Sequence, residues 1–300
     1  QLGADNMAEI TAQPAYQMLQ ETGKMRATQH YLAKVSEILA VNMQRAARVN
    51  HAQPKAVERL FGFPNRQSLP ALVVSTPQAT VHLRGKIDRL DSQDPSQVYG
   101  TIIDYKSNGK HFDWGQAYDG RQMQLLTYWQ AAQLSAEQLG IEAIGGAFFA
   151  KIAPEKLTIK DFKGDVRAML RGEIKPEQFK YRGLFISEPA YIDSLETLAE
   201  GEGSQFYQLK KKANGELYAN SDVILPEDFE LLLKRNLDNI QRASAAILSG
   251  DFPLSPAEGG LQFTPFTDVL RFDRALGDQY KSNTPKNKSD ILKLLKADEE

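Results

Sequence analysis

The stretch at 81–107, VHLRGKIDRLDSQDPSQVYGTIIDYKS, constrains the fold more than any other part of the chain. It reads as two β-strands joined by a polar turn centred near 94–97, a region rich in turn-forming residues. Strand side chains alternate between two faces, so Asp104 and Lys106 share one face. Folding the strands back about the turn sets Asp88 opposite Asp104. The sequence therefore predicts two carboxylates and one ammonium group on one face of a hairpin.

Such a triad has a specific chemical use. Carboxylates suit hard cations such as Mg²⁺ or Mn²⁺, and a neighbouring lysine can orient or deprotonate a water molecule or neutralise an anionic substrate. A phosphodiester is a substrate of this kind. The alternative is a cluster of solvated surface ion pairs, which is the ordinary role of an isolated Asp or Lys. A glycosidase with two carboxylates fits poorly, because it has no use for Lys106.

The composition is that of an ordinary globular protein, with 42% hydrophobic residues and a formal net charge of −2. Attraction to nucleic acid must therefore come from local basic patches. No apolar run is long enough to cross a bilayer and no signal peptide is recognisable, so we predict a cytoplasmic protein without a membrane partner. We predict a basic rim that binds phosphates, made of Arg84, Lys86, Arg89, Lys110 and Arg121. The alternative is that these residues serve only as solubilising charge.

The periodicity of the remaining chain predicts an α/β fold. A helix is expected over 27–49, and strands at 56–61 and 71–75 should feed the sheet that contains the hairpin. A loop at 108–118, a helix over 119–138 and a buried strand over 142–150 follow. Further strands are expected at 181–187 and 206–210, with a short helix over 190–199 between them. A clear helix begins at Pro226 and stops at Gly250, and a short one is expected over 290–296.

The segments GKIDRLD, TIIDYKS and GRQMQLLTY resemble the PD-(D/E)xK nuclease core of the RecB type, and in particular the AddB/RexB family of helicase–nuclease subunits. AVERLFG, GLFISEP and LQFTPFTDVLRFD resemble other segments of that family, so the resemblance covers roughly 45–275. It implies an α/β, restriction-endonuclease-like core, a mixed central sheet flanked by helices, with C-terminal additions. The implied division is a helical segment at 1–50, the nuclease core at 51–150, additions at 151–275 and a charged tail at 276–300.

The resemblance also implies roles for individual residues. Asp88 and Asp104 would be the metal-binding carboxylates, the Tyr105 carbonyl could complete the metal shell, and Lys106 would be the catalytic lysine. The implied cofactor is Mg²⁺ or Mn²⁺. The implied partners are DNA and an A subunit of the AddA/RexA type.

Two further parts of the family's site are expected from the resemblance. Gln124 and Tyr128 correspond to its Q-x-x-x-Y pair, which positions the active site and the DNA backbone. Sites of this type also use a histidine on an upstream helix, but neither His30 nor His51 matches that position convincingly. We therefore expect the missing ligand before Gln1, in a longer protein of which this chain is a fragment.

The C-terminal segment departs from the family pattern. Many AddB proteins hold a [4Fe–4S] cluster through cysteines there, whereas this chain has no cysteine and therefore no such cluster of its own. The aligned positions are Leu261, Thr264 and Leu270. We expect the segment to pack through buried apolar side chains instead, namely Phe263, Phe266, Val269 and Phe272.

The leading hypothesis is a Mg²⁺-dependent DNA exonuclease domain in the B subunit of an AddAB/RexAB-type complex. The resemblance implies end resection at double-strand breaks for recombinational repair. ATP hydrolysis would belong to motor domains, because the chain contains no G-x-x-x-x-G-K-[ST] motif. The alternative is a degenerate nuclease fold that serves as a scaffold and DNA-channel wall without cleavage. The missing histidine and cysteines motivate this alternative, and the intact triad argues against it.

Overall fold

The computed structural model describes residues 9–14, 16, 22–50, 52–93, 98–107, 109–152, 179–257, 259–262, 264–281 and 287–299. The chain divides into two compact units whose segments interleave along the sequence. Unit 1 comprises Gln1–Arg59, Lys86–Phe112 and Ser135–Leu225, and unit 2 comprises Leu60–Gly85, Asp113–Leu134 and Pro226–Glu300.

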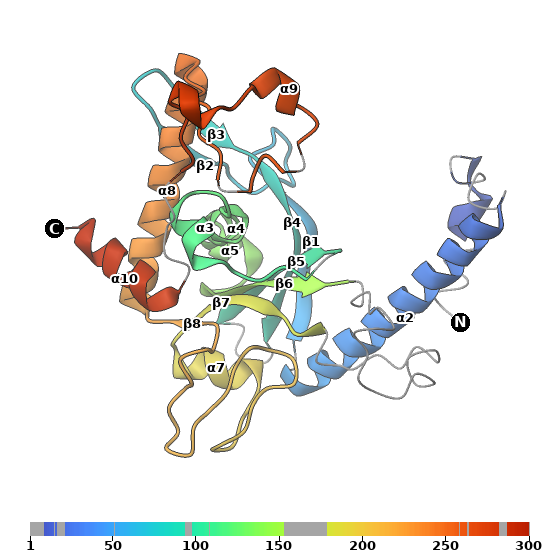
Figure 1. The fold of residues 1–300 in the computed structure, drawn as a ribbon. Coiled ribbons are helices and arrows are strands. Elements are labelled where there is room, and N and C mark those ends of the chain that lie inside the picture. Colours follow the sequence, from blue (N-terminus) through green and yellow to red (C-terminus); the bar gives the residue numbers. More distant parts are fainter. Residues whose placement is uncertain are drawn as a thin grey trace. The chain divides into compact units, whose positions relative to one another are not determined.

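A mixed sheet of six strands, with strand order β1-β4-β5-β6-β7-β8, forms the centre of unit 1 (Figure 1). Antiparallel pairs join β4 to β5 and β6 to β7, whereas β5–β6 and β7–β8 are parallel. The parallel pair β5–β6 brings the carboxyl ends of two strands to one edge of the sheet. The strands are β1 (Ala52–Phe61), β4 (Gly85–Gln93), β5 (Tyr99–Lys106), β6 (Ala143–Lys151), β7 (Arg182–Ile186) and β8 (Val223–Ile224).

One face of this sheet carries the core of unit 1. Ile103 of β5 and Phe148 of β6 pack there with side chains from α2 (Gly23–Asn50) and α7 (Pro189–Leu195). Tyr191 of α7 is fully buried, and its hydroxyl lies 2.8 Å from Thr101 Oγ1. Because side chains alternate along a strand, Asp104 and Phe149, the neighbours of Ile103 and Phe148, point to the opposite face.

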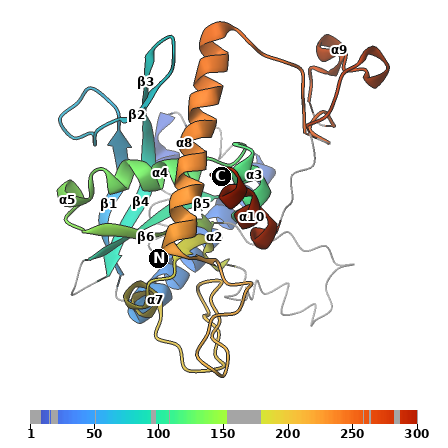
Figure 2. The same cartoon turned by 90° about the vertical axis from the view of Figure 1, so that its left-hand side faces the viewer.

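Unit 2 is built around the long helix α8 (Pro226–Ser249), drawn in orange in Figure 2. This helix contacts the N-terminal strand of a two-stranded sheet and three further helices of the unit. Apolar packing includes the ring pair Trp129–Phe229, whose centroids lie 4.3 Å apart. The contacting elements are β2 (Leu72–Ser75), which pairs with β3 (Thr80–Leu83), and the helices α3 (Trp114–Tyr118), α4 (Gln124–Gln133) and α10 (Lys288–Ala297).

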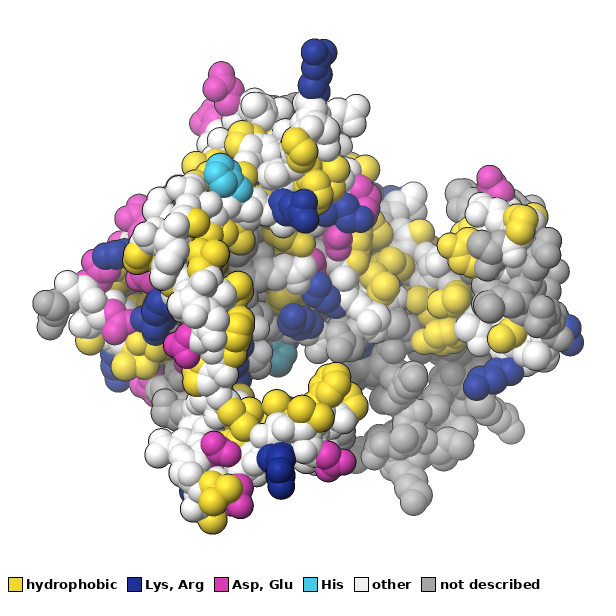
Figure 3. Space-filling model, turned by 90° about the horizontal axis from the view of Figure 1, so that it is seen from above, with side chains coloured by type: hydrophobic (Ala, Val, Ile, Leu, Met, Phe, Trp, Pro, Cys, Tyr) yellow, Lys and Arg dark blue, Asp and Glu magenta, His cyan; other side chains and the backbone are white. Residues whose placement is uncertain are grey.

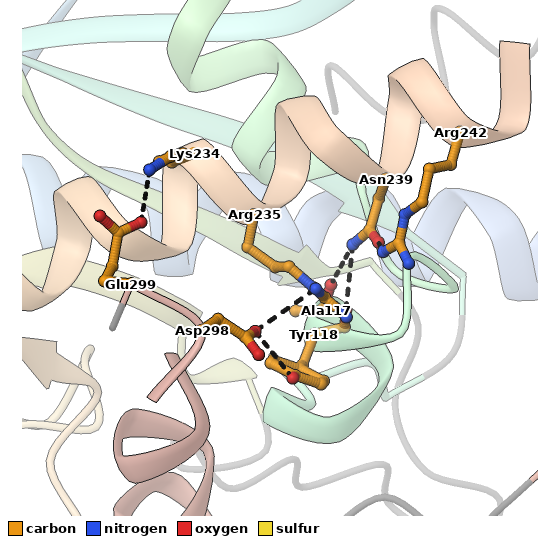
Figure 4. Close-up of polar contacts among 8 residues, drawn as sticks. All are labelled: Ala117, Tyr118, Lys234, Arg235, Asn239, Arg242, Asp298 and Glu299. Carbon is orange, nitrogen blue, oxygen red and sulfur yellow. Dashed lines mark hydrogen bonds and ion pairs between the residues drawn. The ribbon is translucent and has the colours of Figure 1, made fainter. Parts of the chain in front are cut away.

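Polar contacts fix α3 and α10 against α8 (Figure 4). Asp298 accepts a hydrogen bond from the Tyr118 hydroxyl at 2.8 Å, and the guanidinium of Arg235 lies 3.4 Å from the same carboxylate. Asn239 donates to the carbonyls of Ala117 and Tyr118 at 3.3 and 3.0 Å. These bonds tie the end of α3 to α8, where the Ala117 carbonyl also accepts from the backbone N–H of Gly120 at 3.2 Å.

Most predicted elements are present, with four differences. The strand at 71–75 forms β2 of the separate two-stranded sheet, so its predicted place in the main sheet is wrong. The helix predicted over 119–138 is split into α4 and α5 (Ala136–Leu139), and α3 interrupts the loop predicted at 108–118. The segment at 206–210 makes only isolated bridges, of which one joins Tyr207 to Tyr181. The turn at 94–97 lies outside the described residues.

The predicted apolar packing of the C-terminal segment is wrong for two of its four side chains. Phe266 is 61% exposed and Val269, in the short helix α9 (Thr267–Leu270), is 77% exposed. Phe272 is half-buried and stacks on Tyr280 at a centroid distance of 4.6 Å, and Phe263 lies outside the described residues. Hydrophobic side chains exposed at the surface are visible in yellow in Figure 3. Among the described residues no helix combines the length and hydrophobicity needed to span a membrane.

Candidate active site

The hairpin β4–β5 brings the two predicted carboxylates together. Its register pairs Arg89 with Ile103 and Leu90 with Ile102, so the next step along the same register sets Asp88 opposite Asp104. The backbone N–H of Tyr105 donates to Asp88 Oδ2 at 2.9 Å, which fixes the Asp88 side chain against β5. The predicted juxtaposition is therefore confirmed, while the roles of these residues stay a prediction.

Lys106 completes the triad. Its Nζ lies 2.5 Å from Asp104 Oδ2, as the i, i+2 spacing predicts for two residues on one face of a strand. The Asp104 side chain is almost entirely buried, and 22% of the Lys106 side chain is exposed. Burial raises the pKa of the Asp104 carboxyl above its ordinary value; Lys106 opposes the rise, Asp88 adds to it, and Lys110 opposes it weakly. An anionic Asp104 therefore depends on the cations around it.

Arg89 lies on the other face of the hairpin, and the prediction that it belongs to the basic rim is wrong. It follows Asp88 directly, so alternation along β4 turns it toward the core face. Its guanidinium holds the Asp91 carboxylate through two bonds, from Nε to Oδ1 at 2.5 Å and from Nη2 to Oδ2 at 2.7 Å. Only 9% of Arg89 is exposed. Its Nη1 also lies 3.4 Å from the Tyr105 hydroxyl, so this ion pair braces the strand that carries Asp104.

Two other residues of the predicted rim, Lys86 and Lys110, also belong to unit 1. Lys86, two positions before Asp88 and thus on the same face of β4, forms an ion pair with Glu58 of the edge strand β1. Glu58 has a φ of +51°, a left-handed conformation that is uncommon for a residue with a side chain. The Nζ of Lys110 lies 5.1 Å from the centre of the Phe149 ring, beside Lys106 at 5.6 Å from the same centre. Both cations thus remain candidates for phosphate contacts.

The other predicted residues lie in unit 2. Gln124 and Tyr128 share a face of α4, and Gln124 Nε2 donates to the Tyr128 hydroxyl at 3.0 Å. Arg84 packs over the Phe63 ring at 5.4 Å, and Arg121 pairs with Asp119 at 2.7 Å. The helical i, i+4 spacing explains the Gln124–Tyr128 contact. Participation of these four residues in the site stays a prediction.

The donor groups of the triad fit a magnesium-type cation. Mg²⁺ is commonly held by one or two carboxylates, while water and substrate phosphates fill its other positions. Asp88 and Asp104 supply two such carboxylates. Within the described segments no three His, Cys, Asp or Glu side chains gather as a metal-binding group. His30 lies exposed on α2, and His51 falls outside the described residues.

Sequence reasoning missed Lys151, the last residue of β6. The parallel register of β5 and β6 pairs Asp104 with Phe149 and Lys106 with Lys151, so all four side chains lie on one face. Lys151 is only 9% exposed. The strand was recognisable from its sequence, but its register against β5 was not, because parallel neighbours are joined by a long crossover.

Comparison with known proteins identifies a family and several relatives of this chain. A family model described as the PD-(D/E)XK nuclease superfamily matches residues 2–259. Three relatives are each named as the B subunit of an ATP-dependent helicase/deoxyribonuclease. The Leuconostoc citreum KM20 protein is 99% identical over 300 residues, which are all of this chain and 26% of the relative. The Leuconostoc mesenteroides protein is 56% identical over 97% of this chain and 25% of the relative. The Oenococcus oeni protein is 32% identical over 100% of this chain and 27% of the relative.

These findings confirm the resemblance to helicase–nuclease B subunits. The chain spans about a quarter of the length of the relatives it matches. The family match extends over most of the chain and includes the hairpin, α4 and the sheet of unit 1. Nucleases of this superfamily generally use divalent metal ions. The chain belongs to the PD-(D/E)XK nuclease superfamily.

Proposed function

We propose that this chain is a metal-dependent DNA exonuclease domain that hydrolyses phosphodiester bonds. The observation that carries the proposal is the arrangement of Asp88, Asp104 and Lys106 on one face of the β4–β5 hairpin. Two carboxylates and an ammonium group serve phosphoryl chemistry, whereas a structural ion pair needs only one carboxylate.

Each residue of the triad has a distinct part in the proposed reaction. Asp88 and Asp104, together with the Tyr105 carbonyl, would hold Mg²⁺ or Mn²⁺, which when bound polarises the phosphate and lowers the pKa of water. The N–H bond from Tyr105 holds the Asp88 carboxylate in position before any substrate arrives. Attack by water forms a P–O bond to its oxygen and breaks the P–O bond to the nucleoside oxygen; the attacking water loses a proton, the leaving oxygen gains one, and negative charge grows on the phosphoryl oxygens in between. The Lys106 ammonium stabilises that charge and orients the attacking water.

The names of the relatives support a wider setting for this reaction. We propose that the chain acts as the nuclease part of a B subunit, beside an A subunit of the AddA/RexA type, in the cytoplasm. DNA unwound by such a complex would be cut during resection of double-strand breaks for recombinational repair. A nuclease fold without cleavage activity remains the second candidate, motivated by the absence of a third metal-binding side chain among the described residues.

The test is cleavage of single-stranded and duplex DNA by the two-subunit complex carrying Asp104→Asn. Loss of a metal-binding carboxylate should reduce cleavage of one strand by about a thousandfold, since metal-ion stabilisation of the transition state is worth several kcal/mol. Asp193→Asn is the matched control, because Asp193 lies on α7 with 59% of its side chain exposed, paired only loosely with Lys211 at 3.5 Å. Unchanged degradation of both strands by Asp104→Asn would favour the non-cleaving candidate.

A further inference from the structure

The carboxyl ends of the two parallel strands β5 and β6 bring three lysines together, two of them over one aromatic ring. Lys106 and Lys110 lie over the Phe149 ring, with Nζ 5.6 and 5.1 Å from its centre. Lys151 is the register partner of Lys106 and shares its face of the sheet. The loop that carries Lys110 crosses this cluster closely, because a Cβ added at Gly109 would lie 3.7 Å from Lys151 Nζ.

The charges of the cluster favour an anion. Within the described part of the chain, Lys106, Lys110 and Lys151 bring three ammonium groups to the end of the sheet that carries Asp88 and Asp104. A divalent cation at those carboxylates would add further positive charge. Arg182 is the register partner of Phe149, and Asp222 holds its guanidinium at 3.3 Å. The whole chain has a formal net charge of −2, so this concentration of cations is local. Such a local concentration attracts a polyanion without making the protein generally basic.

The chemistry of this cluster distinguishes a phosphate from a base. Phe149 is 1% exposed, so its ring offers no surface on which a nucleobase could stack. The cation–π contacts instead hold the two lysines over the ring. Ligands of mixed and parallel sheets commonly bind outside the carboxyl ends of the strands, which is where Lys106 and Lys151 lie.

We propose that Lys106, Lys110 and Lys151 form a phosphate-binding site for the backbone phosphate of single-stranded DNA adjacent to the scissile phosphate. This inference rests on the proposed nuclease function and deepens it. Lys106 is shared between the two phosphates, whereas Lys110 and Lys151 contact the adjacent one alone. The site fixes the position of the strand relative to Asp104 without reading its sequence, because phosphate oxygens carry no base information.

The test is equilibrium binding of a fluorescent oligothymidylate to the 300-residue chain in EDTA, at 50–500 mM NaCl, so that binding is measured without cleavage. The plot of log K against log [salt] has a negative slope, and each lost phosphate contact should reduce its magnitude by about 0.7 for a single strand. Over the tenfold range from 500 to 50 mM salt, this difference weakens the Kd of each variant relative to the wild type by about a further fivefold. The variants are Lys110→Gln, Lys151→Gln and Lys151→Arg, and the arginine variant should retain most of the affinity.

Lys212→Gln is the matched control, since Lys212 is a half-exposed lysine of unit 1 that pairs with Glu216 at 2.8 Å. Its slope and Kd should equal those of the wild type. An unchanged slope in Lys110→Gln would overturn the proposal even if Lys151→Gln fails to fold. A loss of affinity in Lys212→Gln equal to that in Lys110→Gln would also overturn it. Cleavage by Asp104→Asn separates the two proposals. Full cleavage by this variant would contradict the proposed nuclease function. Lost cleavage by this variant, together with unchanged salt slopes in the lysine variants, would contradict only the phosphate site.

Discussion

Replacement of Arg89 by methionine should destabilise unit 1 strongly, although the residue lies on the face of the hairpin opposite the triad. Methionine keeps much of the length of the arginine stem but removes the guanidinium that holds Asp91 through bonds of 2.5 and 2.7 Å. Asp91 is 3% exposed and would remain as a buried carboxylate without its cation. Removing one partner of a buried ion pair costs about 3–5 kcal/mol, a large part of the ~5–15 kcal/mol that stabilises a typical domain.

The double variant Arg89→Met/Asp91→Leu separates this cause from a packing defect. Replacing both charges by apolar side chains leaves no buried carboxylate, so most of the loss in the free energy of unfolding should be recovered. The exposed pair of Lys34 with Glu37 is the comparison, and Lys34→Met should cost less than about 1 kcal/mol. Urea unfolding should be followed by far-ultraviolet circular dichroism, because both tryptophans lie in unit 2.

The pH dependence of Arg89→Met carries a defined sign. Burial already raises the pKa of Asp91 in the wild type, and Arg89 opposes that rise. Without Arg89 the folded-state pKa of Asp91 rises further above its unfolded value of about 3.9. A group of this kind favours folding below its unfolded pKa and loses that contribution as the pH rises through its folded pKa. The stability deficit of Arg89→Met should therefore shrink from pH 7 to pH 4; a deficit that is constant or below about 1 kcal/mol at pH 7 would refute the reasoning.

Three further variants test other contacts. Gly183→Ala should cost about 1–3 kcal/mol in urea unfolding, because its Cβ would lie 2.1 Å from the Ala147 carbonyl oxygen across the β6–β7 pair; an unchanged midpoint would contradict this packing. Tyr207→Phe should cost about 1–3 kcal/mol, since it removes the 2.7 Å bond from buried Asn50, and a thermal midpoint equal to that of the wild type would disprove the contact. Lys106→Met should lower the single-turnover rate of DNA cleavage by about 10²–10⁴-fold, and full activity would exclude a role for its ammonium in the reaction.

The sequence was sufficient to predict the hairpin and the residues that share one of its faces. Alternation along each strand and the turn between them determine which side chains share a face, so the meeting of Asp88 with Asp104 followed from local rules. The same rule, applied to Arg89, would have placed it on the core face. That prediction failed because the positive charge was taken as a sign of exposure, whereas Asp91 two residues later provides a buried partner.

Long-range pairing explains the remaining differences. Lys151 joins the face of the site through the parallel register of β5 and β6, which depends on a crossover rather than on a local turn. The strand β2 has an ordinary strand composition, but it pairs with β3, its neighbour in sequence, and packs against Ile240 of α8. The exposure of Phe266 and Val269 depends on tertiary contacts of an irregular segment that side-chain hydrophobicity alone does not specify.

The central claim is that the carboxylates of Asp88 and Asp104 act as one hydrolytic site. The direct measurement is a double-mutant cycle in single-turnover cleavage of single-stranded DNA, with Asp88→Asn, Asp104→Asn and the combined variant. Residues that act as a unit are strongly non-additive, so each single variant should lose about a thousandfold and the combined variant little more. Full activity of Asp88→Asn, or a combined loss equal to the product of the two single losses, would contradict the account.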